Sequence, residues 1–325
     1  MKKRIAIIWG GDSSEYDVSR KSGMGIYSFF DKEKYDCRLV CLKKGEWYVE
    51  PNLPIDKNDF SYMEDGVKKG FDYAYITIHG TPGENGYLQG YFELIGMPYS
   101  TCSVLVEALT YDKFVLNNYL RQFGVSVAES ILVRKGEEQN LTEQSVKETV
   151  GFPCFVKPAA DGSSFGVSKV NEWKDMQAAL DKAFAQSDMV MIEAMLEGME
   201  ISQGVYKVQG SKEVVFPATE VVSENDFFDY DAKYNGQVTE ITPARLPQEV
   251  ADRVAKITSA IYDILHAHGI IRVDYIIKNP QSPDAKIFML EINTTPGMTP
   301  TSFIPQQVRA AGLDIGEVLA EIVES

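Results

Sequence analysis

Residues 289–298, MLEINTTPGM, place two oxygen-bearing side chains close together on an otherwise apolar strand. Because side chains alternate along a strand, Glu291 and Asn293 should share one face with Met289. The residues expected on the opposite face are Phe288, Leu290 and Ile292. A carboxylate and a carboxamide in this arrangement are hard oxygen ligands suited to a cation. The alternative is an ordinary solvated strand face.

A second strand, RVDYIIK, carries Arg272 and Asp274 on one face. The turn-forming segment NPQSPDA joins it to the first strand, so we expect the two strands to form a hairpin. Three oxygen ligands and one guanidinium would then converge on one side of a sheet, as is usual where Mg²⁺ is held between protein and nucleotide phosphates. A surface ion pair between Arg272 and a neighbouring acid is the alternative.

Residues 155–170, FVKPAADGSSFGVSKV, combine a lysine at the end of an apolar strand with a loop of small residues. Glycine and serine allow backbone N–H groups to approach phosphate oxygens, and Lys157 supplies positive charge. The pattern G-x-x-x-x-G-K-[ST] is absent, and the strand–loop–strand context differs from that of a P-loop. A glycine-serine hairpin turn is the alternative.

Three further segments extend this set. In MIEAMLEGMEIS, Glu193 and Glu200 flank an apolar linker suited to an adenine ring, unless both acids are simply exposed. NDFFDYDAKYNGQVTE is predicted to be a lid that brings Lys233 and Tyr234 over a site, or else an irregular surface loop. A helix opens near Ser302, where a hydroxyl either caps the free N–H groups or leaves them to a substrate carboxylate.

The elements that must position these residues divide into three predicted domains. The strands RIAIIWGG, CRLVCLKKG and YAYITIHG, combined with helical segments, predict a parallel α/β domain over residues 1–102. Ligands in such sheets lie beyond the carboxyl ends of the strands, here at residues 10–11 and 79–80. One helical stretch from residue 104 to Gly124 opens a small α+β domain, 103–190. Longer strands and two helices predict a mixed-sheet domain over 191–325.

Composition limits the partners. The 325-residue chain has a net charge of −15, which repels nucleic acids and acidic membranes, so neither is an expected partner. No apolar stretch approaches the length of a membrane span, and the N-terminal apolar run is too short for a signal peptide. The four cysteines lack C-x-x-C spacing and are expected to be reduced. These features favour a cytoplasmic protein.

A series of segments occurs in one order over the whole chain: GGDSSEYDVS, HGTPGENGYLQG, Lys113, KPAADGSSFGVSKV, DAKYNG, RVDY and LEINTTPGMT. Together they closely resemble the D-alanine–D-alanine ligase family of the ATP-grasp superfamily, although Asn85 stands where many relatives carry an acid. The resemblance implies a three-domain ATP-grasp fold that holds ATP between the central and C-terminal domains. It also implies ATP-dependent joining of two D-alanine molecules through an acyl phosphate, for peptidoglycan precursor synthesis, by a homodimer formed through the first domain.

The resemblance implies roles on the nucleotide side of the site. Two Mg²⁺ ions, for which Mn²⁺ could substitute, would bridge the ATP phosphates and be held by Asp274, Glu291 and Asn293. The lysines that would contact the phosphates are Lys113, Lys157 and Lys233. The residues that would bind adenine and ribose are Glu193, Glu200, Phe227 and the backbone of Leu196.

The resemblance also implies roles around the two D-alanine molecules. The residues implied around the first are Glu15, Ser163 and Tyr234, while Val18 and His79 would lie near the substrates. Among them, Glu15 would bind the ammonium group and connect through Ser163 to Tyr234. Arg272 and the N–H of Gly297 would stabilise the oxyanion that forms when the second amine attacks. The second carboxylate would be bound by Ser302 and the N–H of Phe303.

Three rival interpretations remain. Another ATP-grasp carboxylate–amine ligase, or one that joins D-alanine to D-lactate, would share the hairpin and differ around Glu15, Tyr234 and residues 300–303. Tyr234 favours amide formation, because the relatives that make the ester lack this tyrosine link. A dinucleotide-dependent oxidoreductase is suggested by the first strand and its two glycines, but G-x-G-x-x-G is absent. A non-enzymatic binding protein would not need the lysine and carboxylate set.

Overall fold

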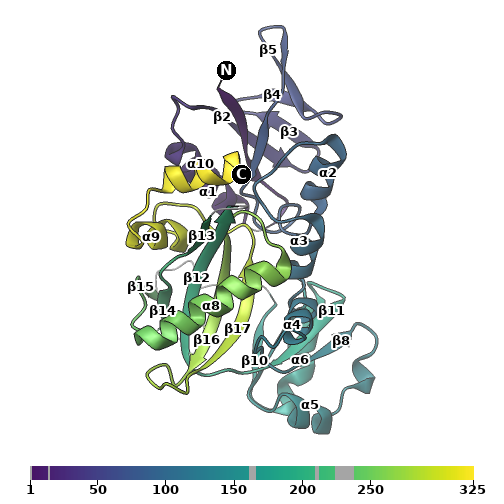
Figure 1. Cartoon of the computed structure of the whole chain (residues 1–325). Coiled ribbons are helices and arrows are strands. Elements are labelled where there is room, and N and C mark those ends of the chain that lie inside the picture. The colour runs from purple at the N-terminus through teal and green to yellow at the C-terminus, as the bar shows by residue number, and fades with distance from the viewer. Residues whose placement is uncertain (1, 14, 161–165, 209–211, 224–237) are drawn as a thin grey trace.

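The computed structural model describes residues 2–13, 15–160, 166–208, 212–223 and 238–325. Within these ranges the chain forms three sheets. The N-terminal sheet lies at the top of Figure 1, the central sheet at the lower right, and the C-terminal sheet between them. Four of the predicted site residues lie outside the described ranges: Ser163, Phe227, Lys233 and Tyr234. The fold is mixed α/β, as predicted.

The N-terminal sheet contains the three predicted strands, β1 (Lys3–Gly10), β2 (Tyr35–Lys43) and β7 (Tyr73–Ile76). β1 lies between the other two and is parallel to both, as predicted. Its eight residues are mostly apolar and six are buried, which is typical of a central parallel strand. Helix α1 (Tyr16–Phe29) follows β1, and helix α2 (Tyr87–Ile95) follows β7.

Four short strands that the sequence analysis did not predict extend this sheet beyond β2. They are β3 (Glu46–Val49), β4 (Leu53–Asp56), β5 (Ser61–Glu64) and β6 (Val67–Lys69). Each pairs antiparallel with the strand before it. The Asp65-Gly66 pair, with φ of 53° and 75°, makes the tight turn between β5 and β6, so an Asp-Gly hairpin signal was present in the sequence.

The predicted helix over 104–124 is wrong in one respect, because it is two helices. Helix α3 (Val104–Tyr111) ends at Asp112, and helix α4 (Lys113–Arg121) begins directly after it. Asp112 has extended backbone and accepts a hydrogen bond from the N–H of Val115 at 3.0 Å, which makes it the N-cap of α4. The break places Lys113 at the first position of a new helix.

The central sheet has the order β10–β9–β11–β8, and all neighbouring strands are antiparallel. Its strands are β8 (Ser130–Arg134), β9 (Cys154–Pro158), β10 (Ser168–Val170) and β11 (Met189–Ala194). Helices α5 (Glu143–Thr149) and α6 (Met176–Phe184) supply apolar side chains to the core on this sheet. Two short 3₁₀ turns complete the unit, at Glu138–Asn140 and Trp173–Asp175.

The C-terminal sheet runs β15–β14–β12–β16–β17, with β13 paired to the far part of β12. Its strands are β12 (Met199–Val208), β13 (Lys212–Val215), β14 (Thr219–Ser223), β15 (Val238–Ile241), β16 (Ile271–Lys278) and β17 (Lys286–Asn293). Helix α8 (Gln248–Leu265) lies across one face of this sheet (Figure 1) and buries its apolar stripe there. β16 and β17 form the predicted antiparallel hairpin.

Helix α9 (Phe303–Ala310) and helix α10 (Ile315–Glu324) end the chain. Side chains of α10 share one core with Ile5 and Ile7 of β1, and with Tyr206 of β12. The C-terminus therefore packs beside the first domain, and both ends of the chain lie in the upper half of Figure 1. This core joins the first and third predicted domains.

Two features bear on the chemistry of the chain. All four cysteines are buried and free. Within the described ranges, no helix is both long and apolar enough to cross a membrane.

Candidate active site

A cavity of about 950 Å³ receives side chains from the central and C-terminal sheets, from the loop after β7, and from α1, α3, α4 and α9. This is at the upper end of the volumes of small-molecule sites. Every predicted site residue that the structure describes lines it: Glu15, Val18, His79, Lys113, Lys157, Glu193, Leu196, Glu200, Arg272, Asp274, Glu291, Asn293, Gly297, Ser302 and Phe303. Residues separated by almost the whole chain thus converge on one space.

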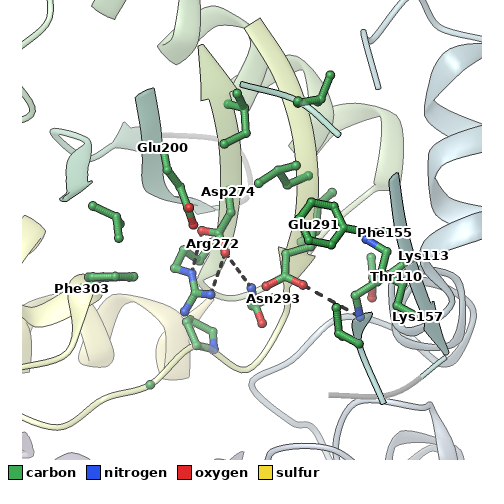
Figure 2. A pocket seen from close by; sticks show the side chains of 18 of the residues that line it. Thr110, Lys113, Phe155, Lys157, Glu200, Arg272, Asp274, Glu291, Asn293 and Phe303 are labelled. Carbon is green, nitrogen blue, oxygen red and sulfur yellow. Dashed lines mark hydrogen bonds and ion pairs between the residues drawn. The ribbon is translucent and has the colours of Figure 1, made fainter. Parts of the chain in front are cut away.

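The hairpin brings the predicted cation ligands together. Asp274 lies opposite Glu291, and Arg272 lies opposite Asn293, in the antiparallel register of β16 and β17. Figure 2 shows these side chains on one side of the two strands, with Arg272 and Asn293 pointing to the Asp274 carboxylate. The register therefore concentrates two carboxylates, one carboxamide and one guanidinium on the cavity face.

The predicted alternation along β17 is wrong on one side of a β-bulge. The register shifts between Asp274 and Tyr275, so that Leu290 is the extra residue on β17. As a consequence Met289 faces the core together with Tyr275 and Ile292. Met289 therefore does not share the face of Glu291. A strict period of two cannot continue through a bulge, because two residues on one strand oppose a single residue on the other.

Asp274 is held by several donors. Arg272 donates from Nε to Oδ1 at 2.9 Å and from Nη2 to Oδ2 at 2.8 Å. The Ser202 hydroxyl donates to Oδ1 at 2.6 Å, and Asn293 Nδ2 donates to Oδ2 at 3.3 Å. The side chain of Arg272 is 17% exposed and that of Asp274 is 11% exposed, so this is not the surface ion pair considered as the alternative. Burial alone would lower the pKa of Arg272, but the Asp274 carboxylate outweighs it and raises that pKa.

The donor set fits Mg²⁺ by its chemistry. Asp274, Glu291 and Asn293 offer carboxylate and carbonyl oxygens, and Mg²⁺ binds through few protein oxygens and completes its shell with water and phosphate. Among the described residues, no cluster of three or more His, Cys, Asp or Glu side chains could hold a metal by itself. A magnesium site here would therefore rely on Asn293 and on oxygens from a bound nucleotide.

Lys113 reaches strand β17 from the opposite wall. Its Nζ lies 3.9 Å from Oε2 of Glu291 (Figure 2). Its backbone N–H donates to the carbonyl of Ala159 at 2.8 Å, which ties the start of α4 to the chain that leaves β9. The helix break at Asp112 thus directs Lys113 toward Glu291.

Lys157 and Glu193 form a second ion pair on the central sheet. Lys157 Nζ donates to Glu193 Oε2 at 2.6 Å, and Asn117 Nδ2 donates to Oε1 at 3.3 Å. Glu193 is only 5% exposed, which excludes the alternative that it is a solvated surface acid. The segment after β11 carries Leu196 along the same cavity wall, and Glu200 begins β12 beside Asp274 in Figure 2.

On the N-terminal side, His79 faces the start of α1. Its Nε2 lies 3.3 Å from the hydroxyl of Ser22, and Nδ1 lies 4.0 Å from Oε1 of Glu84. Burial lowers the pKa of His79, and the charge of Arg272 lowers it further, while Glu15 opposes the shift. The neutral imidazole is therefore favoured beside the cavity.

Glu84 is a cavity residue that the sequence analysis missed. It accepts hydrogen bonds from the hydroxyl of Thr295 and from the N–H of Gly80, each at 2.7 Å. Burial, and secondly the charge of Glu15, raises its pKa to about 7. Glu84 lies in the segment HGTPGENG, in which the sequence analysis singled out only Asn85. The Asn85 side chain hydrogen-bonds to Thr81 and to the N–H of Tyr87 at the start of α2.

Helix α9 begins at the opposite end of the cavity. Ser302 is its N-cap residue, yet its hydroxyl makes no capping bond to the helix and instead accepts from the N–H of Thr299 at 3.1 Å. The Ser302 side chain therefore does not cap α9. The first N–H groups of a helix carry partial positive charge, so Phe303, which lines the cavity, offers a donor suited to a carboxylate.

Comparison with known proteins gives a consistent result over the full length. Family models described as the D-ala D-ala ligase N-terminus and C-terminus match residues 4–102 and 119–324. A D-alanine–D-alanine ligase of Phocaeicola vulgatus is 59% identical, and one of Bacteroides fragilis is 57% identical, each over 100% of this chain and 99% of the relative. The fold also matches the D-Ala:D-Ser ligase VanG of Enterococcus faecalis, with 28% identity, a TM-score of 0.88, and 100% and 99% of the two chains covered. A Bacillus anthracis D-alanine–D-alanine ligase solved with ATP is 29% identical, with a TM-score of 0.79 over 99% and 96% of the chains.

Proposed function

The chain belongs to the D-alanine–D-alanine ligase family, and we propose from this premise that it joins two D-alanine molecules at the expense of ATP. The observation that carries the proposal is the one cavity that brings Lys113, Glu291 and Arg272 together with Glu15 and the start of α9. The product, D-alanyl-D-alanine, is a peptidoglycan precursor. The enzyme class is therefore an ATP-dependent ligase that forms a C–N bond.

The reaction needs no protein nucleophile, because ATP activates the first carboxylate. Glu15 at the entry to α1 holds the ammonium of the first D-alanine, whose carboxylate oxygen attacks the γ-phosphorus to form an acyl phosphate and release ADP. Lys113 and Lys157 bind the phosphate oxygens. The amine of the second D-alanine then attacks the acyl carbon, and phosphate leaves. Arg272 and the N–H of Gly297 stabilise the oxyanion that develops on the acyl oxygen.

On the nucleotide side, Asp274, Glu291 and Asn293 would hold two Mg²⁺ ions, or Mn²⁺ in their place. Bound there, the ions would neutralise charge on the transferring phosphoryl group. Glu193, Glu200 and the backbone of Leu196 line the part of the cavity that suits adenine and ribose. The predicted contacts of Phe227, Lys233 and Tyr234 lie outside the described residues and stay predictions, as does that of Ser163.

A ligase with a different second substrate is the alternative. The D-Ala:D-Ser ligase VanG shares the fold at 28% identity, whereas relatives named D-alanine–D-alanine ligase reach 59%. The closer relatives favour D-alanine in both subsites. His79, Ser302 and Phe303 line the region where a second substrate would be selected.

The test is phosphate release from ATP by the purified protein with single amino acids. We expect release with D-alanine and Mg²⁺, and none with L-alanine or after the metal is chelated, because both steps need the D-alanine carboxylate and charge neutralisation at the phosphates. Mass spectrometry of the product should show D-alanyl-D-alanine. Equal ATP turnover with the two enantiomers would contradict the proposal, and faster turnover with D-serine or D-lactate as the second substrate would favour the alternative.

The protein is further proposed to act as a homodimer through the first domain. Large apolar side chains stand exposed on α2 and α3, which lie side by side: Tyr87 (72%), Leu94 (89%) and Leu105 (75%). A patch of this kind favours contact with a second copy. Sedimentation equilibrium should give twice the chain mass, and Leu94→Glu should halve it, whereas a monomeric wild type would refute the dimer.

We place the activity in the cytoplasm, where ATP is available, and cell fractionation checks this.

A further inference from the structure

The second step of the proposed reaction needs a base, and the described residues assigned to the second substrate do not include one. An amino acid in solution carries an ammonium group, which has no lone pair for attack until it loses a proton. Arg272, Gly297, Ser302 and Phe303 supply a cation, N–H groups and a hydroxyl, all suited to bind oxyanions. Asp274 and Glu291 belong to the proposed metal set.

Acids on the first-substrate side do not fill this role. Glu15 is assigned to the ammonium of the first D-alanine. Glu84 is 15% exposed and its carboxylate accepts hydrogen bonds from Thr295 and Gly80, and the ring of His79 lies against Ser22 of α1. A base for the second amine should lie near the N-terminus of α9, where the carboxylate of the same molecule would be bound.

Glu240 on β15 meets this requirement. It lines the cavity, and its carboxylate accepts a hydrogen bond from Nε2 of Gln306 on the second turn of α9. The same Nε2 donates to the carbonyl of Thr301 at 2.7 Å, so Glu240 is connected through one atom to the residue before Ser302. The sequence analysis did not single out Glu240, since an acid on a short edge strand carries no signal of its own.

Among the described residues, few groups act on Glu240. Arg272 on β16 is the charged group that acts on it, Gln306 on α9 is its hydrogen-bond partner, and Val221 lies opposite it on β14. Arg272 in turn lies 5.4 Å from the ring of Phe303, so the guanidinium, the start of α9 and Glu240 surround one corner of the cavity. Glu240 is exposed at the mouth of the cavity, and partial loss of water raises its pKa, while Gln306 and Arg272 oppose the shift. A carboxylate so placed is a better proton acceptor than a fully solvated one.

We propose that Glu240 is the catalytic base that takes the proton from the ammonium of the second D-alanine. This inference rests on the proposed function and adds a residue to it. One N–H bond breaks and its proton passes to a carboxylate oxygen of Glu240. The freed lone pair forms the C–N bond at the acyl carbon, the C–O bond to phosphate breaks, and phosphate leaves with that electron pair and with the second proton of the nitrogen.

Hydroxylamine provides the test, because it is a neutral nucleophile at pH 7 and attacks an acyl phosphate without needing a base. The variants are Glu240→Gln, Glu240→Asp, and Glu249→Gln as a control that makes the same chemical change at an exposed position on α8. Each is assayed with ATP, Mg²⁺ and D-alanine for dipeptide, and with added hydroxylamine for D-alanine hydroxamate. Formation of the hydroxamate shows that the variant still makes the acyl phosphate in the first step.

For Glu240→Gln we expect dipeptide formation to fall about 100-fold while hydroxamate formation stays within about twofold of wild type, because a positioned base contributes roughly that factor. The residual dipeptide rate should keep rising with pH as the free amine deprotonates by itself. Glu240→Asp should recover part of the rate and the wild-type pH profile.

Equal losses of dipeptide and hydroxamate in Glu240→Gln would overturn the role of Glu240 as a base, and so would an unchanged dipeptide rate. If wild-type protein makes neither product, the proposed function itself fails and not this inference. An effect of Glu249→Gln as large as that of Glu240→Gln would likewise count against the assignment.

Discussion

At the scale of single residues, burial decides which groups carry charge in the cavity. Burial raises the pKa of Glu84 from 4.5 to about 7 and lowers that of His79 below 6.5. The two shifts have opposite effects on stability. Between pH 4.5 and about 7, Glu84 keeps its proton in the folded protein but has lost it in the unfolded chain. The contribution of this group to the free energy of unfolding is therefore complete below pH 4.5 and is lost as the pH rises through about 7. His79 has the opposite effect. Because its pKa is lowered in the folded protein, the unfolded chain takes up the proton first as the pH falls, and the folded protein loses stability.

Glu84→Gln should therefore change how the free energy of unfolding depends on pH. Relative to wild type, the variant should become more stable as the pH rises through the window from 4.5 to about 7, by up to about 3 kcal/mol if the whole shift is relieved. Part of that gain is offset at all pH values, because the new amide has one acceptor oxygen and cannot accept from both the N–H of Gly80 and the hydroxyl of Thr295. Urea unfolding at both ends of the window measures the difference.

The control for this prediction is Glu33→Gln, which makes the same change at an exposed position. It should leave the pH dependence of unfolding as in wild type. A Glu84→Gln variant whose stability stays parallel to wild type over the whole window would show that Glu84 does not hold its proton in the folded state.

At the scale of elements, the site depends on where helices begin and how closely they approach other chain segments. Asp112 starts α4 and thereby places Lys113, and the bulge at Leu290 turns Glu291 into the cavity. Helix α1 approaches the turn after β17 so closely that a Cβ on Gly25 would lie 2.3 Å from the carbonyl oxygen of Met298. Since α1 begins beside Glu15, this contact sets the distance between the two substrate walls.

Gly25→Ala should therefore impair catalysis although alanine is the better helix former. The added methyl group has to push α1 away from residues 297–299, which displaces Glu15 relative to Gly297. We expect the KM for D-alanine to rise and kcat/KM to fall about tenfold or more, because misplacement by a fraction of an ångström is costly in a positioned site. Steady-state kinetics with D-alanine varied at saturating ATP measures this.

Gly90→Ala in α2 is the matched control, because the new Cβ would have only an ordinary contact of 3.8 Å with Val104. That variant should keep wild-type kinetics and gain slightly in stability. Normal kinetics in Gly25→Ala would mean that α1 and the turn after β17 shift together without cost.

At the scale of the whole molecule, the two ends of the chain are packed together. Val318, Leu319 and Ile322 of α10 enter the core that also contains Ile5 and Ile7. Buried hydrogen bonds add further links between distant segments, since Thr294 donates to Glu107 of α3 at 2.5 Å and Thr295 donates to Glu84. The turn after β17 is thus fixed by two acids from the first half of the chain.

The sequence by itself determined the parallel strands of the first domain, the hairpin of β16 and β17, and the family. These follow from local patterns, because alternation, turn residues and ordered motifs are properties of short segments. Through the ordered motifs it also identified fifteen of the residues that line the cavity.

Only the tertiary structure decided the rest. The bulge that turns Met289 into the core, the break at Asp112, and the cavity positions of Glu84 and Glu240 depend on pairing and packing with segments far away in the chain. A lone acid has the same sequence signature whether it is solvated or buried, and the difference arises when other segments exclude water from it. The segment MLEINTTPGM shows both sides: the shared face of Glu291 and Asn293 could be predicted, but the position of Met289 in the core could not.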